Sequence, residues 1–305
     1  MIRPPRSDFW QVGIVPAPIT AFLAPDSLPP LADRIAWLPD PGPWRYLADP
    51  FGVRRPGATH VFVEAFDYRT KHAVIEHHEL GADLEWRGKS TVLQGPHHLS
   101  YPFIIEDQGE VFMLPECHRS RELVLYRAKK FPHEWVRETV LLAGMPVAEA
   151  SVIKHSGRWW MFFTVVGGQL RDQRELHVAF ADQLTGPWKL HPMNPVLDDL
   201  SGARPGGTPF LCADGDVILP VQDCSGTYGG ALHLLWFTNL TPDSIALTKL
   251  SPRLTGGLFS ETHHDGCHTL SRCGEVTLID TKRIAHSWGR HRINLQRRLS
   301  RLLPV

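Results

Sequence analysis

Carboxylate side chains recur in this sequence at an interval of fifteen residues. Asp49 and Glu64 stand fifteen residues apart, Glu116 ends a second segment of this length, and Glu149 begins a third. Carboxylates that converge on one place, beside a cation such as Arg204, supply an acid to protonate a leaving oxygen and a base to activate water or an acceptor. These residue types indicate chemistry at glycosidic bonds, provided that the fold brings them together.

The segments that carry these residues form a repeat. Each unit opens with a short apolar strand, turns at a polar loop such as Asp107-Gln108-Gly109, and returns as a second apolar strand. Five units begin at residues 49, 101, 149, 208 and 268. A period of roughly fifty residues with several strands per unit is typical of a β-propeller.

Both ends of the chain fit this prediction. Residues 9–15 form an apolar strand outside the repeat, which we expect to close the fifth blade and leave no free sheet edge. Residues 284–305 place leucines at helical spacing among arginines. We therefore expect an all-β, five-bladed β-propeller over residues 1–283, closed by the N-terminal strand, and a short, basic, amphipathic C-terminal helix over residues 284–305.

In such a propeller, the starts of the first strands and the ends of the second strands meet on one face around the channel. Residues at these positions are the candidates for a site, and loops beside them complete it. The expected catalytic carboxylates are Asp49, Glu149, Glu116 and Asp223. The expected substrate-binding residues are Arg204, Tyr101, His98, Tyr228, His268 and Thr208.

The catalytic candidates must include an acid and a base. Arg204 suits an anionic part of a substrate, because a guanidinium binds carboxylate or phosphate with two parallel hydrogen bonds.

A structural role is the alternative for these residues. Asp49 precedes a proline and could start a turn, and Glu116 could bind backbone amides between blades. Glu64 and Asp280 more often form structural pairs with lysine or arginine, and the histidines near the mouth are more often satisfied structural groups than ligands.

The totals exclude several other functions. The chain has 32 basic and 32 acidic residues, so its overall charge gives no reason to expect nucleic acid. Its five cysteines have no CxxC spacing, which argues against a disulfide framework or a structural zinc, and we expect no metal or cofactor. The N-terminal residues lack the apolar core of a secretory signal, so the cytoplasm is the expected location.

The basic tail has two interpretations. It could lie on an anionic membrane surface or on a partner, which would place the protein at the inner membrane surface, or it could dock on the propeller.

Several motifs together resemble one propeller family. They are Ala48-Asp49-Pro50-Phe51, His98-Leu99-Ser100-Tyr101-Pro102-Phe103, Ala203-Arg204-Pro205, Gln222-Asp223-Cys224-Ser225, Thr227-Tyr228-Gly229 and His268-Thr269-Leu270. The family occurs as stand-alone bacterial proteins and as the N-terminal domain of plant glucosamine inositolphosphorylceramide transferases. Its architecture is similar to the five-bladed propellers of glycoside hydrolase families 43 and 32. That resemblance implies that the aspartate heading blade one, here Asp49, acts as a base. We then expect Glu149 or Glu116 to be the acid and Asp223 to position or tune the others.

The resemblance and the residues leave three functions open. The first is a carbohydrate-active enzyme that hydrolyses or transfers at a glycosidic bond, with a carbohydrate or glycolipid substrate. The second is a non-catalytic glycan-binding or accessory module of a cell-surface polysaccharide or glycolipid pathway. The third, a protein-interaction propeller, predicts an apolar face in place of carboxylates. Carboxylates that share one pocket favour the first function, whereas carboxylates each held by a neighbouring cation favour a structural role.

Overall fold

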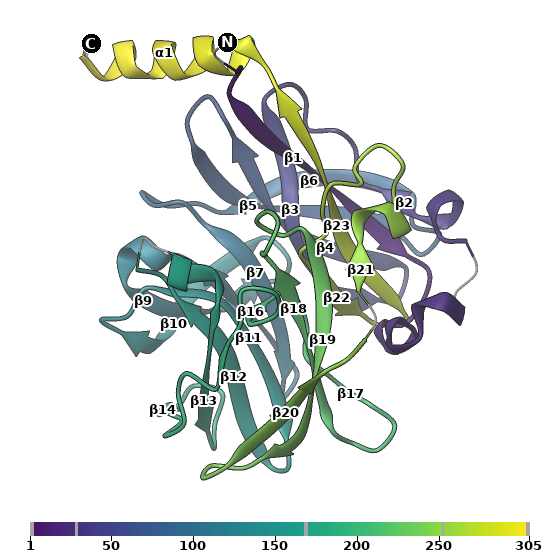
Figure 1. The fold of residues 1–305 in the computed structure, drawn as a ribbon, viewed down its shortest axis with the longest axis vertical. Helices are drawn as coiled ribbons and strands as arrows, with labels where there is room; N and C mark the ends of the chain where they lie inside the picture. The colour runs from purple at the N-terminus through teal and green to yellow at the C-terminus, as the bar shows by residue number, and fades with distance from the viewer. Residues whose placement is uncertain (1–2, 28–29, 168–169, 252, 303–305) are drawn as a thin grey trace.

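Five antiparallel sheets make up the fold, which confirms the five-bladed propeller (Figure 1). The computed structural model describes residues 3–27, 30–167, 170–251 and 253–302. In blades 1 to 3 the strands follow one another in chain order from the innermost to the outermost.

Blades 1 to 4 follow one another along the chain. Blade 1 consists of β3 (Arg45–Arg55), β4 (Ala58–Asp67), β5 (His72–Gly81) and β6 (Trp86–Leu93). Blade 2 consists of β7 (Ser100–Asp107), β8 (Glu110–Glu116), β9 (Glu122–Lys130) and β10 (Glu134–Ala143). Blade 3 consists of β11 (Val147–His155), β12 (Arg158–Val165), β13 (Glu175–Ala181), β14 (Lys189–Leu190) and β15 (Leu197–Asp198). Blade 4 consists of β16 (Arg204–Pro205), β17 (Phe210–Leu211), β18 (Val217–Asp223), β19 (Ala231–Leu240), β20 (Ile245–Lys249) and β21 (Leu254–Thr255).

Blade 5 is built from both ends of the chain. Its strands are β22 (Leu270–Cys273), β23 (Val276–His286), β1 (Arg6–Val15) and β2 (Ala36–Trp37). The predicted closing strand is confirmed, although β1 begins three residues earlier than residue 9. Because Arg6 pairs with His286, β23 also continues three residues beyond the predicted boundary at 283. The proline-rich segment before blade 1 supplies β2 and three short 3₁₀ helices, η1 (Ile19–Leu23), η2 (Pro25–Ser27) and η3 (Ala32–Arg34).

A β-bulge interrupts the inner strand of blades 1, 2 and 3 at the same place. The bulged residues Asp49, Tyr101 and Glu149 have φ angles of 51°, 46° and 51°. A left-handed conformation is costly for tyrosine and glutamate, and such strain gathers at functional sites. The extra residue bends the strand and re-aims the side chain. The fifteen-residue interval in the sequence therefore runs from the bulged residue of the inner strand to a residue near the end of its partner strand.

In blade 4 a glycine takes the positive φ angle at the corresponding interruption of the inner strand. Its inner strand is split into β16 and β17, and Gly207 between them has a φ of 139°. A Cβ atom on Gly207 would lie 1.9 Å from the carbonyl oxygen of Leu270. Only glycine lets the inner strands of blades 4 and 5 approach this closely.

Aromatic contacts hold neighbouring blades together. Phe62 of blade 1 packs edge to face against Trp135 of blade 2, with ring centroids 5.5 Å apart. Phe162 and Phe237 make the equivalent contact between blades 3 and 4 at 4.9 Å. Each buried ring stabilises the fold by about 1.5–3 kcal/mol relative to exposure. This packing fixes the position of each blade relative to the next.

One helix, α1 (Trp288–Leu302), follows β23 at the top of the molecule (Figure 1). The Arg290 guanidinium lies 4.0 Å from the centroid of the Tyr68 ring, and both Arg290 and Arg297 donate hydrogen bonds to the Tyr68 carbonyl. One side of the helix therefore docks on blade 1. Within the described residues, no helix is long and apolar enough to cross a membrane.

Candidate active site

A small cavity of about 160 Å³ lies where the five blades converge. All five blades or their loops contribute to its walls. Its lining residues are Trp10, Tyr46, Asp49, Glu64, His98, Ser100, Glu116, His118, Glu149, Arg204, Tyr228 and His268. Seven of the ten predicted site residues are among them, so the carboxylates of blades 1, 2 and 3 do share one pocket.

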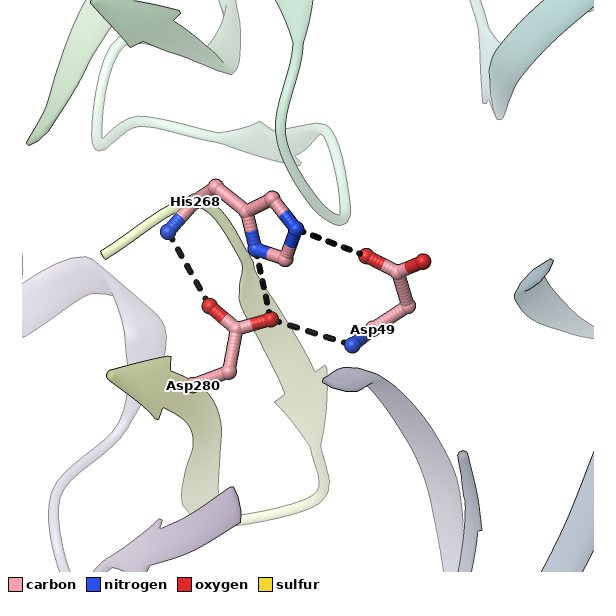
Figure 2. A group of neighbouring side chains, drawn as sticks. All are labelled: Asp49, His268 and Asp280. Atoms are coloured by element: carbon pink, nitrogen blue, oxygen red, sulfur yellow. Dashed lines mark hydrogen bonds and ion pairs between the residues drawn. The ribbon is translucent and has the colours of Figure 1, made fainter. Parts of the chain in front are cut away.

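Asp49, His268 and Asp280 are joined by hydrogen bonds and ion pairs beside the cavity (Figure 2). The Nδ1 atom of His268 lies 2.7 Å from Asp280, and its Nε2 atom lies 3.4 Å from Oδ1 of Asp49. Asp280 also accepts hydrogen bonds from the backbone N–H groups of His268, Thr269 and Asp49, each at 3.0 Å. Because Asp280 holds Nδ1–H, Nε2 is directed at Asp49 and can exchange a proton with it.

The same three residues offer ligand atoms within 4.8 Å of one another. Asp280, however, accepts hydrogen bonds on both of its oxygens. It has little capacity left for a cation, which leaves His268 Nε2 and Asp49 Oδ1 as the available ligand atoms. Two ligands from the protein are fewer than a structural zinc or calcium site requires. The geometry fits a proton relay better than a metal centre.

The Asp49 carboxyl is buried, and its pKa is raised well above the usual range. Desolvation is the largest cause, and the charges of Glu64 and Glu149 add to it. The pKa of Asp280 moves the other way. Burial opposes this, but the charge of His268 and the hydrogen bonds that Asp280 accepts from it lower the pKa. His268 therefore lies between a carboxyl whose pKa is lowered and one whose pKa is raised.

Glu149 lies in a network that occupies both of its oxygens. Oε1 lies 2.8 Å from Arg204 Nη2 and 3.0 Å from the hydroxyl of Tyr228, while Oε2 accepts a hydrogen bond from Gln222. Burial raises the pKa of Glu149, and the Arg204 charge partly offsets this. The Nη1 atom of Arg204 donates to the carbonyl of Asp172, and its buried Nε has no hydrogen-bond partner among the described residues. Glu149 is thus held in one orientation.

Histidines accompany the other two carboxylates. Glu116 lies 2.9 Å from His118 Nδ1, and Glu64 lies 3.2 Å from His98 Nε2. Burial raises the pKa of Glu116, but the hydrogen bond from His118 and the charge of Arg204 outweigh burial, so the net shift is downward. Burial lowers the pKa of His98, yet its hydrogen bond to Glu64 raises it overall. Glu116 is therefore ionised at neutral pH.

Three predicted site residues lie elsewhere. Tyr101 is fully buried behind the cavity, where its hydroxyl lies 2.8 Å from Ser151 and accepts a hydrogen bond from Gly207. Asp223 points away from the cavity and pairs with Arg253 at 3.0 Å. Thr208 lies near the other end of the channel, where it accepts a hydrogen bond from the backbone of Arg272. These positions correct the predicted placement of all three.

Register explains the Asp223 placement. Ala48 pairs with Glu64, Ser100 with Glu116, and Arg204 with Gln222. Gln222, not Asp223, is therefore the blade 4 equivalent of the two glutamates. Since successive residues of a strand point to opposite faces, this one-residue difference moves Asp223 out of the site.

Other site residues carried weaker sequence signals. Trp10 belongs to the closing strand and stacks on His268 at a centroid distance of 3.8 Å. Tyr46 precedes Asp49 by three residues and donates to Glu64 at 3.4 Å. Ser100 is the first residue of β7, and His118 lies two residues after the end of β8. The sequence offers one signal for these residues, which is that they lie close along the chain to predicted site residues or to the predicted closing strand.

Carboxyl groups outnumber arginine and lysine side chains around the cavity. Asp49, Glu64, Glu116, Glu149 and Asp280 contribute five carboxyl groups to the cavity and its wall. Among the described lining residues, Arg204 is the one arginine or lysine. Carboxylates crowded in this way raise one another's pKa, as the charges of Glu64 and Glu149 do for Asp49.

Comparison with known proteins identifies the family. Residues 39–255 match the family described as glucosamine inositolphosphorylceramide transferase 1, N-terminal. The chain belongs to this family. The relative of that name from Oryza sativa subsp. indica is 32% identical over 255 residues, which cover 79% of this chain and 34% of the relative. The relative from Arabidopsis thaliana is 26% identical over 323 residues, which cover 94% of this chain and 40% of the relative. The chain thus spans about a third of the length of the rice relative.

Solved structures share the propeller fold of this family member. The α-L-arabinofuranosidase PaAbf62A from Podospora anserina in complex with cellotriose has a TM-score of 0.59 and 11% identity, covering 78% of this chain and 81% of that one. Zg3597, a family 117 glycoside hydrolase from Zobellia galactanivorans, has a TM-score of 0.52 and 12% identity, with coverages of 79% and 85%. At these identities the likeness concerns the fold alone.

Proposed function

We propose that the protein is a carbohydrate-active enzyme whose central cavity binds one sugar ring and acts on its glycosidic bond. The observation that carries this proposal is that Asp49 and Glu116 line one cavity but have pKa values shifted in opposite directions. A protonated and an ionised carboxyl in one pocket are the acid and base that glycosidic chemistry needs.

The size and lining of the cavity fit a single ring. Its volume of about 160 Å³ is below the roughly 300–1,000 Å³ of pockets for larger ligands. The walls offer carboxylate acceptors, the Tyr228 hydroxyl and the Arg204 guanidinium to the hydroxyl groups of a sugar. The buried Nε of Arg204 is a donor that a bound oxygen would satisfy. Trp10 adds an aromatic wall.

The electrostatics reverse two of the expected roles. Asp49 retains its proton and is the general acid: it protonates the glycosidic oxygen as the bond to the anomeric carbon breaks. Glu116 is the general base and takes a proton from the water or acceptor hydroxyl that forms the new bond. His268 returns a proton to Asp49 through Nε2. Arg204 and Tyr228 hold Glu149 in place, which makes it a positioning residue.

The relatives support a sugar as the ligand. The plant relatives are named glucosamine inositolphosphorylceramide transferase 1, and of the structural neighbours one is named an α-L-arabinofuranosidase and another a family 117 glycoside hydrolase. Hydrolysis and transfer differ only in whether water or a sugar hydroxyl gives its proton to Glu116.

A glycan-binding module is the second candidate. It is favoured by Glu149, since Arg204, Tyr228 and Gln222 already occupy both of its oxygens. A carboxylate held in this way suits recognition as well as catalysis.

A panel of oligosaccharides, aryl glycosides and nucleotide sugars separates the candidates. Product release and binding heats are measured for wild type, Asp49→Asn and Glu116→Gln, with Asp223→Asn as the control carboxylate outside the cavity. An enzyme is expected to lose at least about 100-fold in turnover in the first two variants, while binding and the Asp223→Asn variant are unaffected. Binding without turnover in wild type supports the module. Turnover that survives Asp49→Asn contradicts the catalytic assignment.

A further inference from the structure

The exposed side of α1 carries large apolar side chains that are not packed against the propeller. Trp288, Leu295 and Leu299 have exposed fractions of 53%, 51% and 49%, although each is a large apolar side chain. They recur at intervals of seven and four residues, which places them on one face of the helix. The opposite side, with Arg290 and Ile293, is buried against blade 1.

Basic side chains border this apolar face. Arg292 and Arg298 are exposed, one on each side of the face, and α1 contains no acidic residue. A helix with tryptophan and leucine on one face and arginine beside it is typical of segments that lie in the headgroup region of a membrane. Charge and apolar area thus match an anionic lipid surface.

The dimensions of α1 fit a position along the membrane surface. Its fifteen residues extend about 22 Å, shorter than the roughly 30 Å apolar thickness of a bilayer. Tryptophan concentrates at the boundary between headgroups and acyl chains, where its ring is apolar and its N–H is hydrated. Arginines along this helix, among them Arg290, Arg292, Arg297 and Arg298, exclude a buried transmembrane role for it.

Contacts connect α1 to the end of the propeller where the cavity lies. Arg290 stacks on Tyr68, which packs edge to face on Tyr46 at 5.9 Å, and Tyr46 lines the cavity. β23 runs from blade 5 past Asp280 directly into α1 (Figure 1). A membrane bound by α1 would therefore lie near this end of the molecule.

We propose that α1 binds the surface of an anionic membrane through Trp288, Leu295 and Leu299, aided by Arg292 and Arg298. The lipid surface is recognised by its negative charge and its apolar interior and not by one headgroup. The proposal does not rest on the proposed function, because it uses no residue of the cavity.

Vesicle flotation with the full chain tests it. Wild type is expected to float with vesicles of phosphatidylcholine and phosphatidylserine, to bind weakly to phosphatidylcholine alone, and to dissociate as salt rises. Each arginine near an anionic surface contributes about five-fold in affinity, so Arg292→Glu with Arg298→Glu is expected to weaken binding by at least about 25-fold. Leu295→Glu with Leu299→Glu is expected to cost about tenfold or more.

Matched controls change the same residue types elsewhere. Leu190→Glu with Leu211→Glu alters two other exposed leucines, and Arg127→Glu with Arg137→Glu alters two arginines of blade 2. These variants and Asp49→Asn are expected to float like wild type, and all are expected to melt normally. Equal binding to neutral and anionic vesicles, or full binding by either α1 variant, overturns the proposal. So does a wild-type dimer without lipid binding that Leu295→Glu with Leu299→Glu dissociates, since the face would then contact protein.

Discussion

Two buried groups of titratable residues differ sharply in this propeller. In the central cavity, each histidine faces a carboxylate, as His98 faces Glu64. Between blades 1 and 2, histidines face one another: His60 Nδ1 lies 3.0 Å from His77 Nε2, and the ring of His133 lies 5.5 Å from that of His77. The same residue type is therefore placed beside opposite charge in one region and beside neutral rings in the other.

The pKa values follow from these surroundings. Desolvation, together with the neighbouring His60 and His133, lowers the pKa of His77 to about 3. Phe62 and Phe131 pack against this group, with Phe62 5.1 Å from His77 and Phe131 4.9 Å from His60. His60 and His77 act as packing groups that share a hydrogen bond, whereas each histidine of the cavity lies beside a carboxylate. Burial alone does not identify a functional group; the charge of its partner does.

The largest expected effect is the loss of the buried arginine. Arg204→Met leaves Glu149 buried without its cation, which is expected to lower the free energy of unfolding by about 3–5 kcal/mol at neutral pH. Because protonation of Glu149 relieves the unpaired charge, the variant is expected to regain stability as the pH falls toward 5. Urea denaturation at several pH values measures both effects.

A surface arginine gives the matched comparison. Arg137 pairs with Glu122 at 2.7 Å, but both side chains are largely exposed. Arg137→Met is expected to cost less than about 1 kcal/mol, without recovery in acid. Equal losses in the two variants would mean that Arg204 acts through packing and not through its charge.

The histidine group is expected to limit stability in acid. In the unfolded chain His77 titrates near 6.5, and in the fold near 3, so the unfolded state binds more protons between these values. Stability is therefore full above pH 6.5 and falls as the pH drops toward 3. His77→Gln, which keeps a hydrogen-bond partner for His60, is expected to remove about 2–4 kcal/mol of this loss. Exposed His97→Gln is the control, and a pH profile of the variant that matches wild type contradicts the assignment.

The sequence predicted the features of the fold that follow from the repeat period. The fifteen-residue interval between Asp49 and Glu64 reflects a bulged strand and its partner strand. This spacing is set by the backbone, so it recurs from blade to blade even where the side chains differ. The closing strand could be predicted for the same reason, because an apolar strand outside the repeat must pair somewhere. Short elements such as β2 carry too few residues to leave a pattern.

Single-residue placement was harder to predict. Asp223 and Gln222 are neighbours, and only the register of β18 against Arg204 decides which one faces the cavity. Tyr101 occupies a bulge like Asp49, yet its length carries its hydroxyl across to Gly207 and out of the cavity. The histidine group was not predicted: His60 and His77 meet across neighbouring strands of blade 1, and His133 joins them only when blade 2 packs against blade 1. Contacts between blades leave no periodic signal in the chain.

Asp49→Asn distinguishes a functional carboxyl from a structural one. The raised pKa means that the folded state holds this proton more tightly than the unfolded state, so stability declines as the pH rises from about 3.8 toward the folded pKa. An amide removes that penalty. The variant is expected to melt at the same temperature as wild type or a few degrees higher at pH 7, while losing turnover. A clearly lower melting temperature would make Asp49 a structural residue.

The smallest effect is expected at His98. Its hydrogen bond to Glu64 raises its pKa although burial opposes this, so the pair stabilises the fold fully below about pH 6.5 and loses this stabilisation as the pH rises through the folded pKa. His98→Gln is expected to cost no more than about 1 kcal/mol at pH 6 and less at pH 8, the reverse of the pH dependence at His77. Titration of the imidazole protons by NMR checks this directly: the His98 signal is expected to titrate above 6.5, whereas the His77 signal stays unchanged down to about pH 4. If both histidines titrate near 6.5, the partner of a buried histidine does not set its protonation in this protein, and the contrast between the cavity and the blade interface fails.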